Sequence, residues 1–187
     1  MNKVVIGIVG EKGSGKGTFP KLLQEMLPDK KIVRTTFSDV MTETLNIWGL
    51  NKSRENYIKL VVAMRDSFGP KVLADAVKKR IGGLNGEIIV VDGMRWLADL
   101  EMIKSIDGKI VYITADPKIR FERTKLRGEK DGEIETTFEQ FMEEEKAPTE
   151  VDIPEIAKNS DFTINNNGSF EEFKNQVNDF IQKLLNS

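Results

Sequence analysis

The clearest chemical pattern in the chain is the run GEKGSGKGT, residues 10–18, which has the phosphate-loop spacing G-x-x-x-x-G-K. Glycines let consecutive backbone N–H groups turn inward around phosphate oxygens, and the start of the following helix adds positive potential. Lys16 would supply a point charge to the β and γ phosphates of a nucleotide. The predicted ATP-binding residues here are Gly10, Lys12, Gly13, Ser14, Gly15, Lys16, Gly17 and Thr18.

The alternative interpretation of this run is a glycine-rich turn without a binding function, which contains a lysine by chance. The flanking residues argue against it, because the apolar run VVIGIV precedes the loop and a helical pattern over Thr18 to Leu27 follows it. One position departs from the common pattern. Gly17 stands where a Ser or Thr usually holds Mg²⁺ through its hydroxyl, and the nearest hydroxyl belongs to Thr18.

Two carboxylates follow apolar strand-like runs. Asp92 ends the run IIVVD, the place of a Walker-B-type aspartate that orients Mg²⁺ or its waters, and its alternative role is a helix cap. Asp39 follows a second run in the same way. It would orient or deprotonate the acceptor, or it would simply cap the next helix, and both readings stay open.

Arginines are the other candidate catalytic groups, because a planar guanidinium binds phosphate oxygens bidentately and stabilises the charge of a moving phosphoryl group. Arg95 follows Asp92 closely, and Arg65 lies at a break between two helical patterns; both are predicted acceptor ligands. The alternative for Arg95 is an ordinary surface charge. Arg123 and Arg127 are predicted catalytic residues on a helix that opens at Pro117, where Arg120 can share their face.

Charge changes sign sharply after that helix. Residues 117–128 carry five basic side chains and one acidic one, whereas residues 129–155 carry two basic and eleven acidic. A cationic rim followed by an acidic segment predicts a lid over ATP, at about 124–152. The alternative is a solvated helix with acidic partners. Within the segment, Glu143-Glu144-Glu145 is predicted to be a solvated face rather than a site.

The elements that must position these residues alternate between strands and helices. Apolar runs predict strands at Val4–Val9, Lys31–Phe37, Glu87–Val91, Lys109–Thr114 and Phe162–Ile164. Helical patterns lie between them, and a capping box at Ser169 and Glu172 opens the last helix. This order predicts one α/β domain over residues 1–187, a three-layer sandwich around a parallel sheet. Two segments, about 38–83 and 128–152, are expected to be too polar for the core and to lie over the strand ends.

Composition excludes several kinds of chemistry. The chain has no cysteine and no histidine, so disulfides, thiolate zinc sites and Ser-His-Asp triads are ruled out. The formal net charge of -2 argues against a non-specific nucleic-acid binder, and no apolar run approaches the length of a membrane span. We therefore expect a cytoplasmic protein with neither nucleic-acid nor membrane partners.

Four runs together resemble adenylate-kinase-like and dephospho-CoA-kinase-like P-loop kinases, including an archaeal group of uncharacterised kinase-like proteins. They are GEKGSGKGT, VVDGMR, TADPKIRFERTKLRG and SDFTINNNGSFEEFKNQV. The resemblance implies a five-stranded sheet of order 2-3-1-4-5, bound ATP and Mg²⁺, a helical acceptor insert over about 38–83, and a lid. It also implies that Thr18 touches the α phosphate, that the metal is held largely through water and substrate, and that Arg95 grips the acceptor phosphate. Asn165 and Asn167 would lie near the adenine ring.

The leading functional hypothesis is a nucleoside or deoxynucleoside monophosphate kinase, active on a small phosphorylated acceptor as a monomer or homodimer. The first alternative is a dephospho-CoA-kinase-like enzyme whose acceptor is a ribose hydroxyl. The second is a non-catalytic ATP-binding switch protein. A phosphate acceptor needs arginines more than a base, whereas a hydroxyl acceptor favours a base such as Asp39.

Overall fold

The computed structural model describes residues 3–128 and 135–185, and a parallel five-stranded sheet forms its centre. The strands are β1 (Val4–Val9), β2 (Ile32–Thr36), β3 (Ile88–Asp92), β4 (Lys109–Thr114) and β5 (Phe162–Asn165). Their order is β2-β3-β1-β4-β5, and every neighbouring pair is parallel. The predicted order 2-3-1-4-5 is confirmed.

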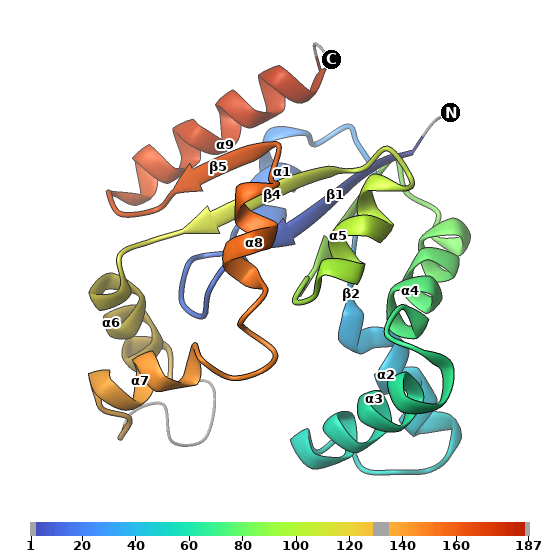
Figure 1. Ribbon diagram of the computed structural model, residues 1–187. Coiled ribbons are helices and arrows are strands. Elements are labelled where there is room, and N and C mark those ends of the chain that lie inside the picture. The colour runs from blue at the N-terminus through green and yellow to red at the C-terminus, as the bar shows by residue number, and fades with distance from the viewer. Residues whose placement is uncertain (1–2, 129–134, 186–187) are drawn as a thin grey trace.

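Helices cover both faces of this sheet, as the three-layer prediction requires (Figure 1). Because successive side chains of a strand point to opposite faces, β1 contributes to two cores. Ile6 and Ile8 pack under α1 (Phe19–Met26) and α9 (Phe170–Leu185). Val5 and Val9 lie in the other core, which is covered by α4 (Val72–Gly83), α5 (Leu97–Lys104) and α8 (Ile153–Lys158).

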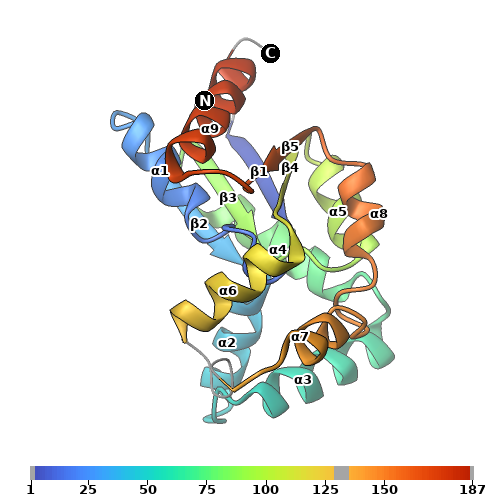
Figure 2. The ribbon, with the colours of Figure 1, turned by 90° about the vertical axis from the view of Figure 1, so that its left-hand side faces the viewer.

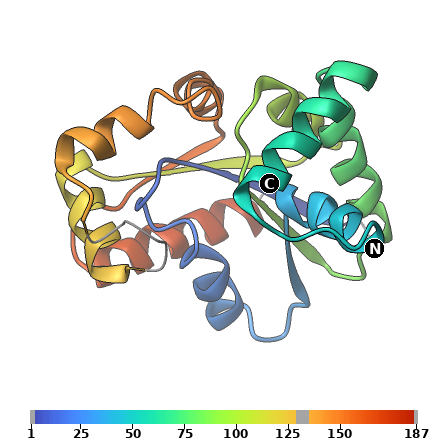
Figure 3. The same ribbon diagram turned by 90° about the horizontal axis from the view of Figure 1, so that it is seen from below.

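Two pairs of helices stand beyond the carboxyl ends of the strands (Figure 2), and seen from below they lie on opposite sides of the phosphate loop (Figure 3). One pair is α2 (Phe37–Ile47) and α3 (Arg54–Phe68), and the other is α6 (Pro117–Arg127) and α7 (Phe138–Glu144). In open parallel sheets, ligands bind at the carboxyl ends of the strands. The fold therefore places the candidate residues between these two pairs.

Local signals explain where several helices begin and end. Ser53 caps α3, and Ser169 with Glu172 forms the expected reciprocal bonds before α9. Asp39, a candidate cap in the sequence, is the third residue of α2 and not its N-cap. Thr36 is the N-cap, because its hydroxyl accepts the Asp39 N–H at 3.1 Å while Asp39 accepts the Thr36 N–H at 2.8 Å.

The expectation that residues 38–83 are too polar for the core is wrong for α4. Val77 and Ile81 of that helix are buried against the sheet, whereas α3 buries none of its residues. Residues 128–152 likewise include one buried anchor, Phe141 of α7. Helical spacing alone does not distinguish a helix that covers a sheet from one that projects past it. No helix in the described ranges is both long and apolar enough to cross a membrane.

Candidate nucleotide and acceptor site

The phosphate loop holds its lysine through two of its own backbone oxygens. The Lys16 ammonium donates to the carbonyl oxygens of Gly10 and Glu11, each at 2.6 Å. Burial and, to a smaller extent, the nearby Arg95 charge lower the pKa of Lys16 to about 8, against the opposing charges of Asp92, Glu11 and Glu150. A cation that loses this much hydration is poorly compensated, so an anionic ligand beside it is strongly favoured.

The glycines of the loop differ in what they require. Gly13 has φ +80°, and a Cβ there would lie 2.5 Å from the Arg120 carbonyl oxygen. Gly15 has φ +104°, and its Cβ would meet the Asn166 amide at 2.4 Å. Both positions therefore demand glycine. Gly17 has open space around its Cα, so the missing hydroxyl there is not forced by crowding.

Two polar side-chain atoms of the loop are buried without a hydrogen-bond partner in the part of the chain that the structure describes. They are Ser14 Oγ and Glu11 Oε2. Native proteins leave few such groups, and a hydroxyl in a phosphate loop fits a phosphate oxygen. The other Glu11 oxygen accepts a bond from the Tyr112 hydroxyl; burial, reinforced by this bond, raises the pKa of Tyr112 to about 12.

Asp92 lies at the end of β3, where a Walker-B-type carboxylate was predicted, and it is buried. Arg34 of β2 donates to it at 2.6 Å. The described residues contain no cluster of three or more acidic, histidine or cysteine side chains able to hold a metal alone. Mg²⁺ is commonly bound by one or two carboxylates plus substrate phosphates, so the single carboxylate of Asp92 fits a metal carried largely by a nucleotide. The part played by Thr18 stays a prediction.

Asp39 takes part in capping α2 as the carboxylate partner of the N-cap Thr36. Its carboxylate accepts bonds from the Thr35 hydroxyl at 3.0 Å and the Thr36 hydroxyl at 2.7 Å, and Arg80 lies 4.0 Å away. Partial burial opposes ionisation, but these bonds and the Arg80 charge hold the pKa of Asp39 below its ordinary value. The group is thus ionised at neutral pH and poorly suited to take up a proton. Its contact with an acceptor stays a prediction.

The two predicted acceptor arginines converge on the turn after β3. The Arg95 guanidinium forms an ion pair with Glu150, and the Arg95 N–H donates to Asp99 at 2.8 Å. The Arg65 guanidinium lies over the ring of Trp96, 4.5 Å from its centroid. Residues 65 and 95 belong to different elements, so only the fold brings them to one place.

The arginines of α6 have three different surroundings. Arg120 is only 3% exposed; it donates to the Ala115 carbonyl at 2.8 Å and the Lys12 carbonyl at 3.3 Å, and it pairs with Glu145. Arg123 donates to the Asn166 carbonyl at 2.9 Å, and burial lowers its pKa. Arg127 lies on the exposed last turn. Arg120, which sequence grouped with the lid, instead supports the phosphate loop.

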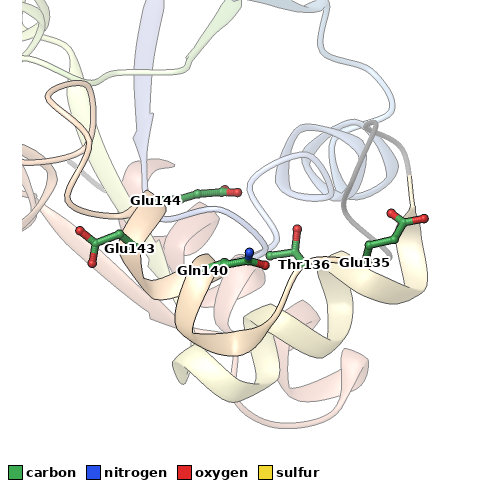
Figure 4. Close-up of a pocket in the computed structure, with 5 residues that line it drawn as sticks. All are labelled: Glu135, Thr136, Gln140, Glu143 and Glu144. Atoms are coloured by element: carbon green, nitrogen blue, oxygen red, sulfur yellow. The ribbon is translucent and has the colours of Figure 1, made fainter.

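The acidic segment also differs from expectation. Glu145 is 24% exposed and pairs with the buried Arg120, so the prediction of a solvated face is wrong for it. Glu144 pairs with Lys12 at 3.0 Å but remains exposed, as predicted. Figure 4 shows a pocket beside them, lined by Glu135, Thr136, Gln140, Glu143 and Glu144. Three carboxylates make this pocket unsuitable for phosphate. Residues 129–134 of the predicted lid lie outside the described ranges.

The turn NNNG contacts the phosphate loop through its middle asparagine, which sequence reasoning missed. Asn166 is 7% exposed and donates to the Ser14 carbonyl at 2.9 Å. The backbone of Asn165 is occupied by Gln176, at 2.9 and 2.7 Å, and Asn167 accepts the Asp116 N–H at 2.5 Å. The prediction named Asn165 and Asn167 because polarity alone does not show which of three asparagines points inward.

Comparison with known proteins places this site in a family. The model of the AAA domain family AAA_18 matches residues 6–149. A UPF0200 protein of Saccharolobus islandicus is 33% identical over 97% of this chain and 94% of its own length. A UPF0200 protein of Sulfurisphaera tokodaii is 31% identical over 97% of both chains.

Solved structures with the same fold include shikimate kinases. The enzyme from Acinetobacter baumannii, in complex with shikimate, has a TM-score of 0.58 at 14% identity and covers 98% of this chain and 94% of its own. The enzyme from Bacteroides thetaiotaomicron has a TM-score of 0.61 at 13% identity, over 98% and 99%. At these identities the likeness concerns the fold alone. The chain therefore belongs to the AAA domain family and to the UPF0200 proteins, and its fold is that of the P-loop kinases.

Proposed function

We propose that this protein is an ATP-dependent phosphotransferase that moves the γ-phosphoryl group to a small phosphate-bearing acceptor, a nucleoside or deoxynucleoside monophosphate. The observation that carries the proposal is the distribution of cations at one edge of the sheet. Lys16 lies in the phosphate loop, Arg34 reaches Asp92 from β2, Arg95 lies in the turn after β3, and Arg65 belongs to α3. One set suits the donor phosphates, and the other suits a second anion.

The donor side would be the loop from Gly10 to Thr18. Lys16 would exchange its two carbonyl contacts for β- and γ-phosphate oxygens, and Ser14 would gain a partner for its buried hydroxyl. Arg123 would reach the transferred group from α6, with Arg127 as a further candidate. When bound, Mg²⁺ would neutralise charge on the phosphates, and Asp92 and Thr18 would hold its waters.

In the transfer step, an oxygen of the acceptor phosphate would attack the γ phosphorus. The bond between that phosphorus and the β–γ bridging oxygen would break, and ADP would leave with the bonding electron pair. A phosphate oxygen is already a nucleophile at neutral pH, so no strong base is required. The capping bonds that hold the Asp39 carboxylate ionised agree with this requirement. Arg65 and Arg95 would orient the acceptor and balance its charge.

The proposal is tested by measuring ADP release from ATP and Mg²⁺ with AMP, CMP, GMP, UMP, dTMP, dephospho-CoA and shikimate as separate acceptors. We expect release that depends on a monophosphate, abolished by Arg95→Met and retained by Asp39→Asn. Arg54→Met is the matched control, because Arg54 is an exposed arginine at the start of α3. ATP binding without acceptor-dependent release across the panel would refute the proposal and favour an ATP-binding switch.

A hydroxyl acceptor is the second candidate. It is favoured by the ionised Asp39 in the first turn of α2, which would orient a hydroxyl group, and by the shikimate-bound structural neighbour. Release with dephospho-CoA or shikimate alone, lost in Asp39→Asn, would select this candidate.

A further inference from the structure

The turn that carries Arg95 is closed by a buried carboxylate from the next helix. Asp99, 1% exposed, accepts the Arg95 N–H at 2.8 Å and the Trp96 N–H at 3.0 Å. It thereby fixes the backbone from which the Arg95 side chain leaves. An asparagine has the hydrogen-bond acceptor needed for this backbone role, so the negative charge calls for a second explanation.

That second explanation is Arg65, which reaches the same turn from α3. The charged groups facing Asp99 are Arg65 from α3 and Asp152 from the residues before α8, together with the two N–H donors of its own turn. The Arg65 guanidinium lies over the ring of Trp96, with its central carbon 4.5 Å from the ring centroid. Arg65 Nη1 is nevertheless buried without a hydrogen-bond partner among the described residues.

A buried guanidinium N–H without an acceptor is costly, so the arrangement is complete only when an anion supplies that acceptor. Arg95, which starts from the same turn, already binds a carboxylate, that of Glu150. Both arginines thus contact or belong to one turn. The guanidinium of Arg95 is paired with Glu150, whereas that of Arg65 has a buried N–H group without an acceptor among the described residues.

We propose that Trp96 and Asp99 are positioning residues of the acceptor site, which hold Arg65 and Arg95 so that both guanidinium groups bind one anionic group of the acceptor. The inference rests on the proposed function for the identity of that anion. Trp96 positions Arg65 by stacking against its guanidinium. Asp99 attracts the charge of Arg65 and binds the backbone N–H of Arg95.

The chain provides its own reporter for a test that needs no acceptor. Its two tryptophans are Trp48, 75% exposed at the end of α2, and Trp96, so Trp48→Phe leaves Trp96 as the single emitter. Because burial raises the pKa of Asp99 to about 6, lowering the pH from 8 to 5 neutralises it. We expect acrylamide quenching of Trp96 to rise through that range, as Arg65 loses its charge partner and the stack loosens.

Asp99→Asn in the Trp48→Phe background should remove this transition. Glu101→Gln is the matched control and should retain it, because Glu101 is an exposed carboxylate on the same helix, paired with Lys71. A transition that persists in Asp99→Asn, or that is absent from the parent, would overturn the inference. If Asp99→Asn does not fold, Arg65→Lys replaces it: this change keeps the charge but loses the planar stack, so quenching should be high at every pH, and unchanged quenching would overturn the inference.

A kinetic test uses the acceptor, among those named under the proposed function, that the protein phosphorylates. Asp99→Asn should raise the acceptor KM about tenfold, the size expected when a hydrogen-bonded charge is lost, and leave the KM for ATP unchanged. An equal rise in both KM values would mean general damage and would overturn the positioning role. If no acceptor is turned over, the proposed function has failed, and the fluorescence result by itself decides the inference.

Discussion

Replacing Asp99 by asparagine is expected to stabilise the protein at neutral pH, even though it weakens acceptor binding. Burial raises the pKa of Asp99 from 3.8 to about 6, against the opposing effects of the Arg95 and Trp96 N–H bonds and the Arg65 charge. At about 1.4 kcal/mol per pH unit, keeping this carboxylate ionised at pH 7.5 costs about 3 kcal/mol of unfolding free energy.

The sign follows from proton binding. Between about pH 4 and pH 6 the folded protein binds the Asp99 proton and the unfolded chain does not, so this group lowers stability as the pH rises through that window. The asparagine variant lacks the effect. Its unfolding free energy relative to the parent should therefore increase by about 2 kcal/mol between pH 4.5 and pH 7.5.

Urea unfolding followed by circular dichroism at both pH values measures this difference, with Glu101→Gln as the control for loss of a negative charge on α5. Other titrating groups cancel, because they are common to parent and variant. A relative stability that is the same at both pH values would refute the reasoning. It would mean that Arg65 and the N–H donors fully compensate the burial of the charge.

The remaining predictions concern the phosphate loop and its neighbours. Since the pKa of Lys16 is lowered to about 8, nucleotide binding at pH 8.5 should take up about 0.8 proton, measured by calorimetry in buffers of different ionisation enthalpy, and Lys16→Met should remove this uptake. Gly13→Ala should abolish nucleotide binding and lower the melting temperature, because its Cβ would lie 2.5 Å from a backbone oxygen, whereas Gly17→Ala, with open space, should change the melting temperature little; equal effects would contradict the geometry. Glu150→Gln should tighten binding of inorganic phosphate about fivefold by freeing Arg95, and unchanged affinity in a phosphate titration would show that the ion pair does not compete.

Sequence reasoning succeeded where the deciding signal is local. Buried strands show as short apolar runs, and the phosphate loop requires glycines and a lysine at fixed spacing, so β1 and Lys16 were both placed correctly. The same logic placed Asp92 at the end of β3. The sheet order came from the resemblance of four runs to a known family, since periodicity contains no information about which strands are neighbours.

Local signals were insufficient where one pattern serves two surroundings. The apolar residues of α4 recur at the same helical spacing as those of α3, which projects beyond the sheet, yet α4 packs against the sheet. The acidic run Glu143–Glu145 is compatible with a solvated face, yet Glu145 forms an ion pair with the buried Arg120. The burial of α4 and the pairing of Glu145 both depend on which other element packs against them. The residues of the element itself do not contain that information.

The sequence by itself determined the chemistry that is available: a phosphate loop, a strand-end carboxylate, many arginines, and no thiol or imidazole. Only the tertiary structure decided which of these groups meet. Arg34 and Asp92 are 58 positions apart, and Asn166 and Ser14 are 152 apart, yet each pair is hydrogen-bonded. Side-chain types and spacing specify local conformation. Contacts between residues far apart in the sequence depend on strand order, and also on burial, which excludes the water that would otherwise compete for these hydrogen bonds.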